Sequence, residues 1–270
     1  MVPGAPAALL VVIDLALARV PDVPQRVDTR GMLLSGRAEV DFPSAPESSA
    51  DGFVVSVADA ALVSVVGRPP RELIRDVVER LEGDVNVLCQ PRDADHVSGA
   101  LPSWRRTGGI IHALEDVPPW SEQSDEDTRV FTLADAPPLA HVPPSLRREL
   151  MNALRGRTTA RFVPGVLPDR DVPPPLEPLP MAASWAGRAP VSFCYPVFRT
   201  EAWWDVSIET LEAHRRHGHA ARAARTLIRH MWQTGRAPVW GAPEHNDASL
   251  ALARQLGFRE VGRLTVLTAA

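Results

Sequence analysis

The chain has 270 residues, which is enough for one large or two small domains, and 45% of them are apolar, which is enough for a buried core. Its formal net charge is −4, from 33 acidic and 29 basic residues, and no block of one sign dominates. A general nucleic-acid binder is therefore not expected, because it needs a basic face to neutralise phosphates.

Residues 1–20 are mostly apolar, but they carry no early positive charge and are interrupted by Asp14. A secretory signal begins with a basic segment, and a membrane span needs about 20 apolar residues. We therefore expect a buried strand or helix here and no membrane association. The two cysteines, Cys89 and Cys194, are too few and too far apart for a disulfide framework, so a cytoplasmic protein with free cysteines is expected.

In residues 1–175, short apolar segments alternate with polar and proline-rich breaks. Residues 38–52 and 116–128 have the composition of loops, and residues 164–178 that of an internal linker. The pattern predicts strands at 62–66, 85–89, 109–114 and 129–133, and helices at 70–81, 94–101 and 145–154. This alternation favours a mixed α/β region, in which no catalytic motif is visible.

Residues 176–270 form a second region with a more regular pattern. It predicts strands at 181–185, 190–197, 203–211, 239–241 and 260–267, and helices at 219–232 and 247–256. Along 219–232, alanines and larger apolar residues recur at helical spacing on one face, while arginines occupy the opposite face.

The segment His214-Arg215-Arg216-His217-Gly218-His219-Ala220 connects a predicted strand to this amphipathic helix. A helix N-terminus presents unpaired N–H groups and a partial positive charge, so it is suited to bind an anion. Gly218 lets the backbone approach a ligand closely, and Ala220 is small enough not to block it. Because arginine adds charged contacts to phosphate, the segment predicts a diphosphate site.

This segment resembles the diphosphate loop of the GNAT acetyltransferase family. That loop is an arginine or glutamine, two residues, a glycine, one residue, and a glycine or alanine, here Arg215-x-x-Gly218-x-Ala220. A second family element is an asparagine, a small residue three places on, and a Gly-Phe pair that ends the helix, here Asn246, Ser249 and Gly257-Phe258. The short loop is a weak motif alone, but the ordered set over about residues 180–268 is much more specific.

The resemblance implies an α/β (α+β) fold with a mixed, mostly antiparallel central sheet flanked by helices. The C-terminal half, residues 176–270, would be a GNAT-like domain that binds acyl-CoA. The N-terminal half, residues 1–175, would be an α/β region that shapes the acceptor pocket. Its alternation of strands and helices leaves open a degenerate copy of the same fold, without the loop motif.

By the same resemblance, acetyl-CoA is the co-substrate. The diphosphate would be bound by backbone amides of Arg215, Arg216, His217, Gly218, His219 and Ala220. Thr210 and Leu211, at the end of the strand 203–211, would pair with the pantetheine arm. Asn246 and Ser249 would line the other side of that arm, although Asn246 is also a typical helix cap, so a purely structural role stays open.

Ala253 departs from the family pattern. Many members carry a tyrosine at this position, four residues before the Gly-Phe glycine, where it protonates the leaving thiolate. The single tyrosine of this chain is Tyr195, on an earlier predicted strand. Another group or water would then supply the proton, or transfer is weak, or the site only binds CoA.

The strand 203–211 carries the candidates for a general base. Its alternation places Asp205, Ser207 and Glu209 on one face. A central strand covered on both faces is normally apolar throughout, so polar residues here indicate a cleft. A carboxylate can accept the proton that an amine loses when it attacks a thioester, which makes Glu209 the first candidate and Asp205 the second. The alternative is that both side chains simply face solvent.

The remaining reactive residues are interpreted as non-catalytic. His214, His217 and His219 are not expected to bind a metal, because zinc needs about four converging ligands and two of these histidines flank the glycine of the anion loop. Cys194 has no obvious paired histidine and is expected to be a buried structural cysteine.

The sequence therefore predicts an enzyme, an N-acetyltransferase that moves acetyl from acetyl-CoA to an amine of a small molecule or protein by direct attack. The alternative is a non-catalytic module of the same fold that binds or senses CoA. The reason to consider it is Ala253, which replaces the usual tyrosine of the family. Another acyl-CoA reaction, such as decarboxylation, is selected by no residue of the chain.

Overall fold

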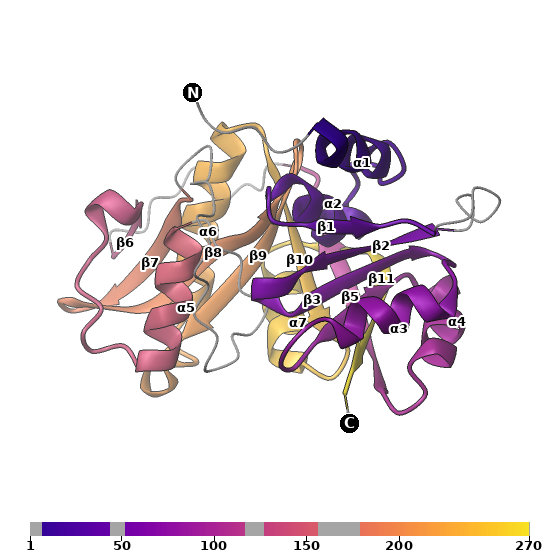
Figure 1. Cartoon of the computed structure of the whole chain (residues 1–270). Helices are drawn as coiled ribbons and strands as arrows, with labels where there is room; N and C mark the ends of the chain where they lie inside the picture. The colour runs from indigo at the N-terminus through magenta and orange to yellow at the C-terminus, as the bar shows by residue number, and fades with distance from the viewer. Residues whose placement is uncertain (1–6, 44–51, 117–126, 156–178, 270) are drawn as a thin grey trace. The chain divides into compact units, whose positions relative to one another are not determined.

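The computed structural model describes residues 7–43, 52–116, 127–155 and 179–269 (Figure 1). These residues form eleven strands and seven α-helices, divided between two compact units. Unit 1 comprises the described residues within 1–110 and 262–270, and unit 2 those within 111–159 and 173–261. The expected linker at 164–178 and the expected boundary between residues 175 and 176 lie outside the described residues, as does most of the expected loop at 116–128.

Unit 1 is a mixed sheet with helices. The helices are α1 (Ala7–Leu17), α2 (Val27–Leu34), α3 (Arg71–Glu79) and α4 (Ala94–Ala100). The strands are β1 (Glu39–Asp41), β2 (Gly52–Val57), β3 (Leu62–Gly67) and β4 (Asn86–Cys89), with the first part of β5 (Arg105–Ala113) and the last part of β11 (Arg259–Thr268). In the order β1-β2-β3-β4-β11, only the β3–β4 pair is parallel.

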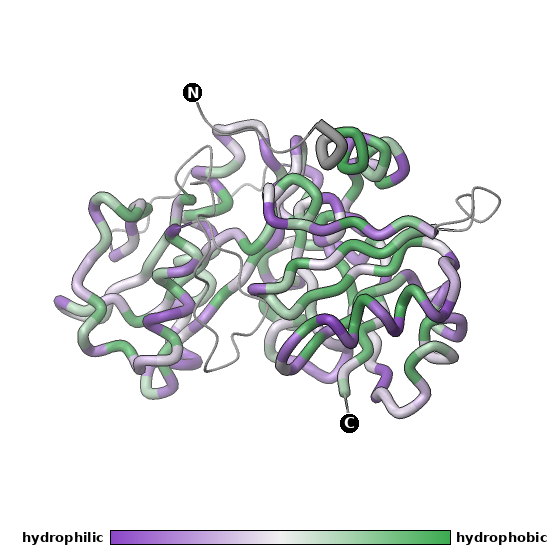
Figure 2. Tube along the Cα trace, in the orientation of Figure 1, coloured by the Kyte–Doolittle hydropathy of each residue, from purple (hydrophilic) through white to green (hydrophobic). Residues whose placement is uncertain are grey.

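The core of unit 1 forms because its central strands are almost continuously apolar and α3 is amphipathic. Ile74, Val77 and Val78 of α3 are buried in one cluster with the valines of β3 and β4. Figure 2 shows the green of these strands and the alternation of purple and green along α3. The predicted strands at 62–66 and 85–89 and the predicted helices at 70–81 and 94–101 are confirmed.

Several elements of unit 1 differ from the sequence prediction. The pattern does not predict α2 or β2, and β1 lies inside the expected loop at 38–52. The strand expected at 109–114 begins earlier, at Arg105. The sequence does not indicate this earlier start, because the first residues of the strand are polar and exposed and show no apolar alternation. The expected N-terminal helix forms as α1, but the expectation that it is buried is wrong: Val11 is 66% and Leu15 46% exposed. No helix among the described residues is long and apolar enough to cross a membrane.

Unit 2 is a second mixed sheet with helices. The helices are α5 (Pro144–Leu154), α6 (His219–Gln233) and α7 (Asp247–Gln255). The strands are β6 (Thr128–Phe131), β7 (Met181–Ala186), β8 (Ala189–Arg199), β9 (Trp203–Thr210) and β10 (Ala237–Pro243). In the order β10-β9-β8-β7-β6, only the β9–β10 pair is parallel. These elements confirm the predicted ones to within two residues at each end.

The helices α5 and α6 cover opposite faces of this sheet (Figure 1). Phe193 and Tyr195 of β8 are buried in one cluster with Leu150 and Leu154 of α5. On the other face, the Ser184 Oγ of β7 bonds to Nδ1 of His219 in α6 at 2.9 Å. Strand alternation therefore sorts the residues of β7, β8 and β9 into an α5 face and an α6 face.

The two cysteines are buried, as expected, in β4 and β8. Burial raises the pKa of the Cys89 thiol to about 12 and that of the Cys194 thiol further. A thiol attacks as its thiolate, so neither cysteine is prepared for nucleophilic chemistry.

One order of elements occurs twice along the chain. An antiparallel strand pair, a helix, a strand parallel to the second strand, and a short helix follow one another as β2-β3-α3-β4-α4 and as β8-β9-α6-β10-α7. A further strand ends each series, β5 in the first and β11 in the second. These last strands are exchanged: the end of β11 pairs with β4 in unit 1, whereas Leu114, directly after β5, bonds to the Pro238 carbonyl of β10 in unit 2.

The apolar face of α6 generates a stability prediction. Leu227 is fully buried on this helix, so Leu227→Ala should lower the free energy of unfolding by about 2–5 kcal/mol through lost burial and the cavity left behind. The control is Gln233→Ala at the exposed end of the same helix, with an expected change below about 0.5 kcal/mol. Urea unfolding measures both, and equal losses would show that α6 is not held by its apolar face.

Candidate active site

The parallel strands β9 and β10 separate partway along their length. They pair from Trp203 opposite Ala237 to Asp205 opposite Val239, and no pairing between them continues from there to Thr210 and Pro243. Backbone groups on the facing edges of the two strands therefore lack the partners that a continued sheet would give them. No pattern in the sequence indicates this separation, because both strands keep their strand pattern beyond it.

The loop after β9 leads from the separated strands into α6. A 3₁₀ turn over Glu212–His214 comes first, and Arg215 is extended. Arg216 and Gly218 then adopt positive φ angles of 61° and 78°, and α6 begins at His219. Gly218 is the residue type that suits such a φ, and a Cβ added there would lie 3.2 Å from Nη1 of Arg222.

Most backbone amides of this loop have no backbone acceptor. His214 N–H bonds to the Leu211 carbonyl at 2.8 Å and Arg215 N–H to the Glu212 carbonyl at 3.2 Å. After Arg215, the first backbone N–H along the chain that has a backbone acceptor is that of Arg222, which bonds to the Gly218 carbonyl at 3.1 Å. Among the described residues, the amides of 216–221 therefore have no backbone acceptor. Free amides at the start of a fifteen-residue helix are suited to bind an anion, and the anion site stays a prediction.

The side chains of the loop stabilise its shape. Arg215 Nε donates to the Thr210 carbonyl at 3.3 Å, and His217 Nδ1 donates to the Arg215 carbonyl at 2.7 Å. His219 is buried, and its Nδ1 accepts from the Arg222 guanidinium at 2.8 Å. Burial and the adjacent charge of Arg222 lower the pKa of His219, so its ring stays neutral and only its backbone amide can face a ligand.

Asn246 and Ser249 lie at the start of α7, after β10. Asn246 is the helix cap, because its side-chain oxygen accepts from the Ser249 N–H at 3.2 Å. The Ser249 hydroxyl accepts from the indole N–H of Trp240 in β10 at 2.9 Å. The structural role that the sequence left open for Asn246 is therefore present, and both residues fix the start of α7 beside the end of β10.

Ala253 is fully buried in α7. Its methyl group cannot donate a proton. The pair Gly257-Phe258 ends the helix as expected, with Gly257 at φ 95° and Phe258 buried. No proton donor therefore occupies the position where the family tyrosine is found.

The carboxylates of β9 occupy different surroundings. Asp205 lies opposite Val239, where the pairing with β10 ends, and Glu209 lies opposite Phe193 of β8. Both are partly exposed, so the alternative that they simply face solvent stays open. Burial, and after it the negative charge of Glu149, raise the pKa of Glu209, while Arg215 opposes this shift.

Glu149 and Tyr195 are polar residues of this region that sequence reasoning did not bring together. The Tyr195 hydroxyl donates to Glu149 Oε1 at 2.6 Å, and Tyr195 lies opposite Ser207 of β9. Burial and the charge of Glu149 raise the pKa of Tyr195, so this tyrosine is a poor proton donor to a leaving group. The two residues are 46 positions apart and come from a helix and a strand, so no local pattern indicates their contact.

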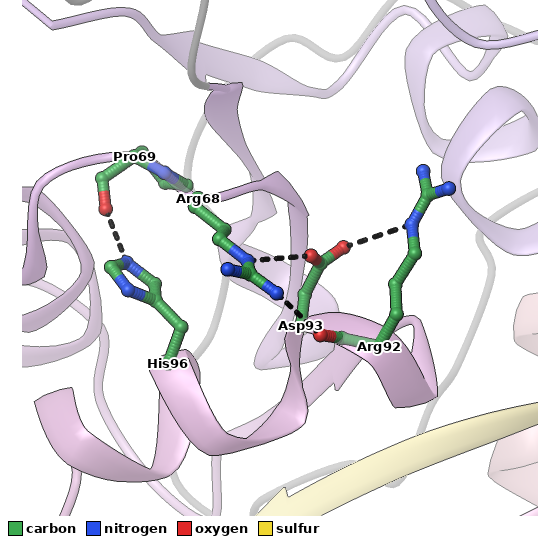
Figure 3. Close-up of polar contacts among 5 residues, drawn as sticks. All are labelled: Arg68, Pro69, Arg92, Asp93 and His96. Carbon is green, nitrogen blue, oxygen red and sulfur yellow. Dashed lines mark hydrogen bonds and ion pairs between the residues drawn. The ribbon is translucent and has the colours of Figure 1, made fainter.

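In unit 1, the matching position after the parallel strands β3 and β4 has a different structure (Figure 3). Arg68 Nε donates to Asp93 Oδ1 at 3.3 Å and Arg68 Nη2 to the Arg92 carbonyl at 3.0 Å, which joins the two loops that follow these strands. His96 Nε2 donates to the Pro69 carbonyl at 2.7 Å. Proline has no N–H, so this position has two amides fewer than the loop of unit 2, and the carboxylate of Asp93 is buried here.

Comparisons with known proteins agree with this geometry. A family model described as GNAT acetyltransferase matches residues 183–267. No curated protein sequence matches the chain. A GCN5-related N-acetyltransferase-like protein from Streptococcus suis is similar in structure, with a TM-score of 0.65 at 14% identity, over 97% of this chain and 100% of that chain.

Two further solved structures are similar over nearly the full length. An acetyltransferase of the GNAT family from Colwellia psychrerythraea has a TM-score of 0.58 at 11% identity, over 97% of both chains. A tandem GNAT protein from the clavulanic acid biosynthesis pathway has a TM-score of 0.54 at 13% identity, over 96% of this chain and 94% of that chain.

At these identities a structural likeness shows the fold, and the predicted fold class is confirmed. The pairings within the described units are mostly antiparallel, with helices flanking the strands, and the solved structures match both halves of the chain. The matched segment contains β8, β9, the free amide loop, α6, β10 and α7 in the order that the sequence resemblance requires. Residues 183–267 of the chain thus match the GNAT acetyltransferase family model, and both halves share the fold of solved GNAT structures.

Proposed function

We propose that the protein is an acetyl-CoA-dependent N-acetyltransferase whose cofactor site lies in unit 2. The observation that carries this proposal is the separation of β9 from β10 directly before a loop of free amides. The separated edges offer hydrogen bonds to an amide-containing chain, and the loop offers them to a diphosphate. Acetyl-CoA has both parts in this order.

The residues present fit such a ligand, with one refinement. The Leu211 N–H bonds to the Val191 carbonyl of β8 at 2.9 Å, and the Leu211 carbonyl already accepts from His214 N–H. Because neighbouring residues of a strand direct their backbone groups to opposite sides, Thr210 presents its N–H toward β10, and its carbonyl also accepts from Arg215 Nε. Thr210 is therefore the better proposed partner of the pantetheine arm, with Asn246 and Ser249 at the opposite side.

The proposed diphosphate contacts come from the free loop amides of Arg216 to Ala220, because Arg215 N–H already bonds to the Glu212 carbonyl. The guanidinium groups of Arg215 and Arg216 are exposed at this loop and add positive charge. His219 contributes its amide alone, because its ring is held inward by Ser184 and Arg222.

The proposed chemistry is direct acyl transfer. Acetyl-CoA supplies the acetyl group as a thioester. An amine attacks the carbonyl carbon, a carbon–nitrogen bond forms, the carbon–sulfur bond breaks, and the thiolate leaves. Glu209 accepts the proton that the amine loses, directly or through water, and its raised pKa makes it a stronger base than an ordinary glutamate. Asp205 is the second candidate, and water protonates the thiolate because Ala253 does not.

A non-catalytic module that binds or senses CoA is the second candidate function. Two observations favour it: Ala253 is buried and apolar, and Tyr195 is committed to Glu149. The two functions differ in one measurement, the amine-dependent release of free thiol from acetyl-CoA. Release with any amine supports the enzyme, whereas tight CoA binding without release over a broad amine library supports the module.

We also propose that the N-terminal region is a degenerate copy of the same fold. The repeated order of elements and the parallel β3–β4 pair support a duplication. Unlike β9 and β10, these strands stay paired up to Cys89, the last residue of β4, and contacts of Arg68 join the loops beyond them. The copy would then hold no CoA and contribute structure alone.

The loop assignment predicts a specific loss of CoA affinity. Gly218→Leu should weaken CoA binding about tenfold or more, because a side chain enters the cradle and disturbs charge-assisted hydrogen bonds to phosphate. Gly235→Leu is the matched control: Gly235 follows the same helix, has a similar φ of 80°, and has no atom within 4 Å of an added Cβ. Titration calorimetry measures both Kd values, and equal affinities would reject the loop as the diphosphate site.

The base assignment predicts a change in turnover. Glu209→Gln should lower kcat by about 10²–10⁴-fold while the Kd for acetyl-CoA stays within a few fold. In the unchanged protein, kcat/KM should fall as the pH drops through a pKa above that of ordinary glutamate, because protonated Glu209 cannot act as a base. Unchanged kcat for Glu209→Gln across the pH range would exclude Glu209 as the base.

The degenerate copy predicts a stoichiometry of one. Titration of CoA into the full chain should give a single binding event per chain, because Pro69 and Pro70 carry no N–H at the matching position of unit 1 and Arg68 joins the two loops there. Gly218→Leu should weaken this one event and leave no second one behind. Two binding events, or one that survives Gly218→Leu at full affinity, would place CoA in unit 1 and contradict the proposal.

A further inference from the structure

A group of polar side chains lies beside the proposed base, on the face of the unit 2 sheet that α5 covers. Phe193 and Tyr195 of β8 are buried in one cluster with apolar residues of α5, so their side chains point to this face. Ser207 of β9 lies directly opposite Tyr195, and Glu209 lies directly opposite Phe193. Because residues opposite one another in an antiparallel pair point to the same face, Ser207 and Glu209 also face α5.

Tyr195 links this face of the strands to α5. Its side chain is 2% exposed, so the cluster fixes the ring. Its hydroxyl donates to Oε1 of Glu149 in α5 at 2.6 Å, and Ser207 hydrogen-bonds to the same hydroxyl. Tyr195 is the single tyrosine of the chain, and neither the proposed CoA site nor the proposed transfer step uses it. The hydrogen bond from this fixed ring holds the Glu149 carboxylate in one place.

This contact brings Glu149 close to Glu209. Tyr195 and Glu209 are diagonal neighbours across the β8–β9 pair, a spacing that aromatic and long side chains can bridge. The charges of both glutamates act on Tyr195, and the charge of Glu149 acts on Glu209. Glu149 and Glu209 are partly exposed, so neither is sealed in the core. Tyr195 therefore keeps a second carboxylate beside the proposed base.

Other charged groups lie near this face, but Glu149 and Arg215 are the two that act on Glu209. Arg215, in the loop after β9, opposes the effect of Glu149 and is the smaller of the two influences. Its Nε donates to the Thr210 carbonyl, which directs part of the guanidinium to the backbone. The further charged residues are Asp205 of β9, Arg147 and Arg148 of α5, and Arg129 of β6, which lies over the Trp185 ring.

We propose that Tyr195 and Glu149 are positioning residues for the proposed base: Tyr195 holds the Glu149 carboxylate beside Glu209, and this second negative charge sets the pH range of acetyl transfer. This inference rests on the proposed transfer at Glu209. A nearby like charge disfavours the charged form of a carboxyl group, so Glu149 makes Glu209 hold the proton from the amine more strongly. Neither positioning residue has to touch the acceptor.

The first test is the pH dependence of amine-dependent thiol release from acetyl-CoA. Glu149→Gln should move the acid limb of the kcat/KM profile about half a pH unit to one unit lower, because Glu209 then loses its proton more readily. The glutamine oxygen can still accept from Tyr195. One acceptor is used throughout, so that its own ionisation is common to all profiles. The Kd for acetyl-CoA should stay within a few fold.

Matched variants separate charge from structure. Glu149→Asp keeps the charge and should restore most of the original profile. Tyr195→Phe keeps the ring but not the hydroxyl, and it should displace the limb in the same direction as Glu149→Gln, because Glu149 can then turn away. Glu115→Gln is the control for a lost negative charge. Glu115 is exposed and follows Leu114, which bonds to Pro238 at the start of β10, so the profile should stay in place.

A second measurement reads Glu209 without turnover. Carbon-13 NMR of protein labelled at the glutamate carboxyl groups follows the titration of each side chain, and the Glu209 signal is the one that Glu209→Gln removes. In Glu149→Gln this signal should titrate at lower pH than in the unchanged protein, by the same half unit to one unit as the profile. In Glu115→Gln it should titrate as before.

The outcomes distinguish this inference from the proposed function. A Glu209 titration that Glu149→Gln leaves in place, or that Glu115→Gln displaces equally, overturns the role of Glu149 while acetyl transfer stands. An unchanged profile in Tyr195→Phe overturns the role of Tyr195. A displaced Glu209 titration without any amine-dependent thiol release supports the pairing of the two glutamates and overturns the proposed transfer.

Discussion

The separation of β9 from β10 is the constraint on which the rest of unit 2 depends. A parallel pair that stops at Asp205 and Val239 leaves backbone donors and acceptors on two facing edges, and such groups are costly to leave unpaired away from water. The loop that follows adds the free amides of residues 216–221. Both sets of groups have partners when an elongated ligand with amide and phosphate groups lies between the strands. The positive φ angles of Arg216 and Gly218 and the inward ring of His219 serve the same geometry.

Unit 1 shows that the same order of elements does not require a ligand. Its parallel strands β3 and β4 stay paired to the last residue of β4, so few backbone groups remain to be satisfied there. Beyond the strands, Arg68 reaches Asp93 and the Arg92 carbonyl, and the prolines at 69 and 70 remove two amides that a phosphate would use. The absence of a glycine-rich motif after β3 therefore corresponds to a physical difference: internal contacts satisfy this position.

Local patterns of the sequence predict the parts of the structure that local physics decides. The apolar stripe of α6, the anion loop at Gly218 and the cap at Asn246 each depend on residues within a few positions of one another. The contact of Tyr195 with Glu149, the pairing of β11 with β4 and the separation of β9 from β10 depend on segments far apart in the chain. Periodicity carries no information on such contacts, so the surroundings of Glu209 become visible in the structure alone.

Ala253 bears less on the proposed reaction than its place in the family pattern suggests. A thiol has a pKa of about 8.5, so a departing thiolate is only a weak base near neutral pH and water can protonate it. An attacking amine is different, because it must lose a proton near neutral pH, where an alkylammonium with a pKa of about 10 stays charged. The base is therefore the more demanding requirement. Burial and the charge of Glu149 raise the pKa of Glu209, which makes this carboxylate a stronger base, while the nearby Arg215 limits the shift.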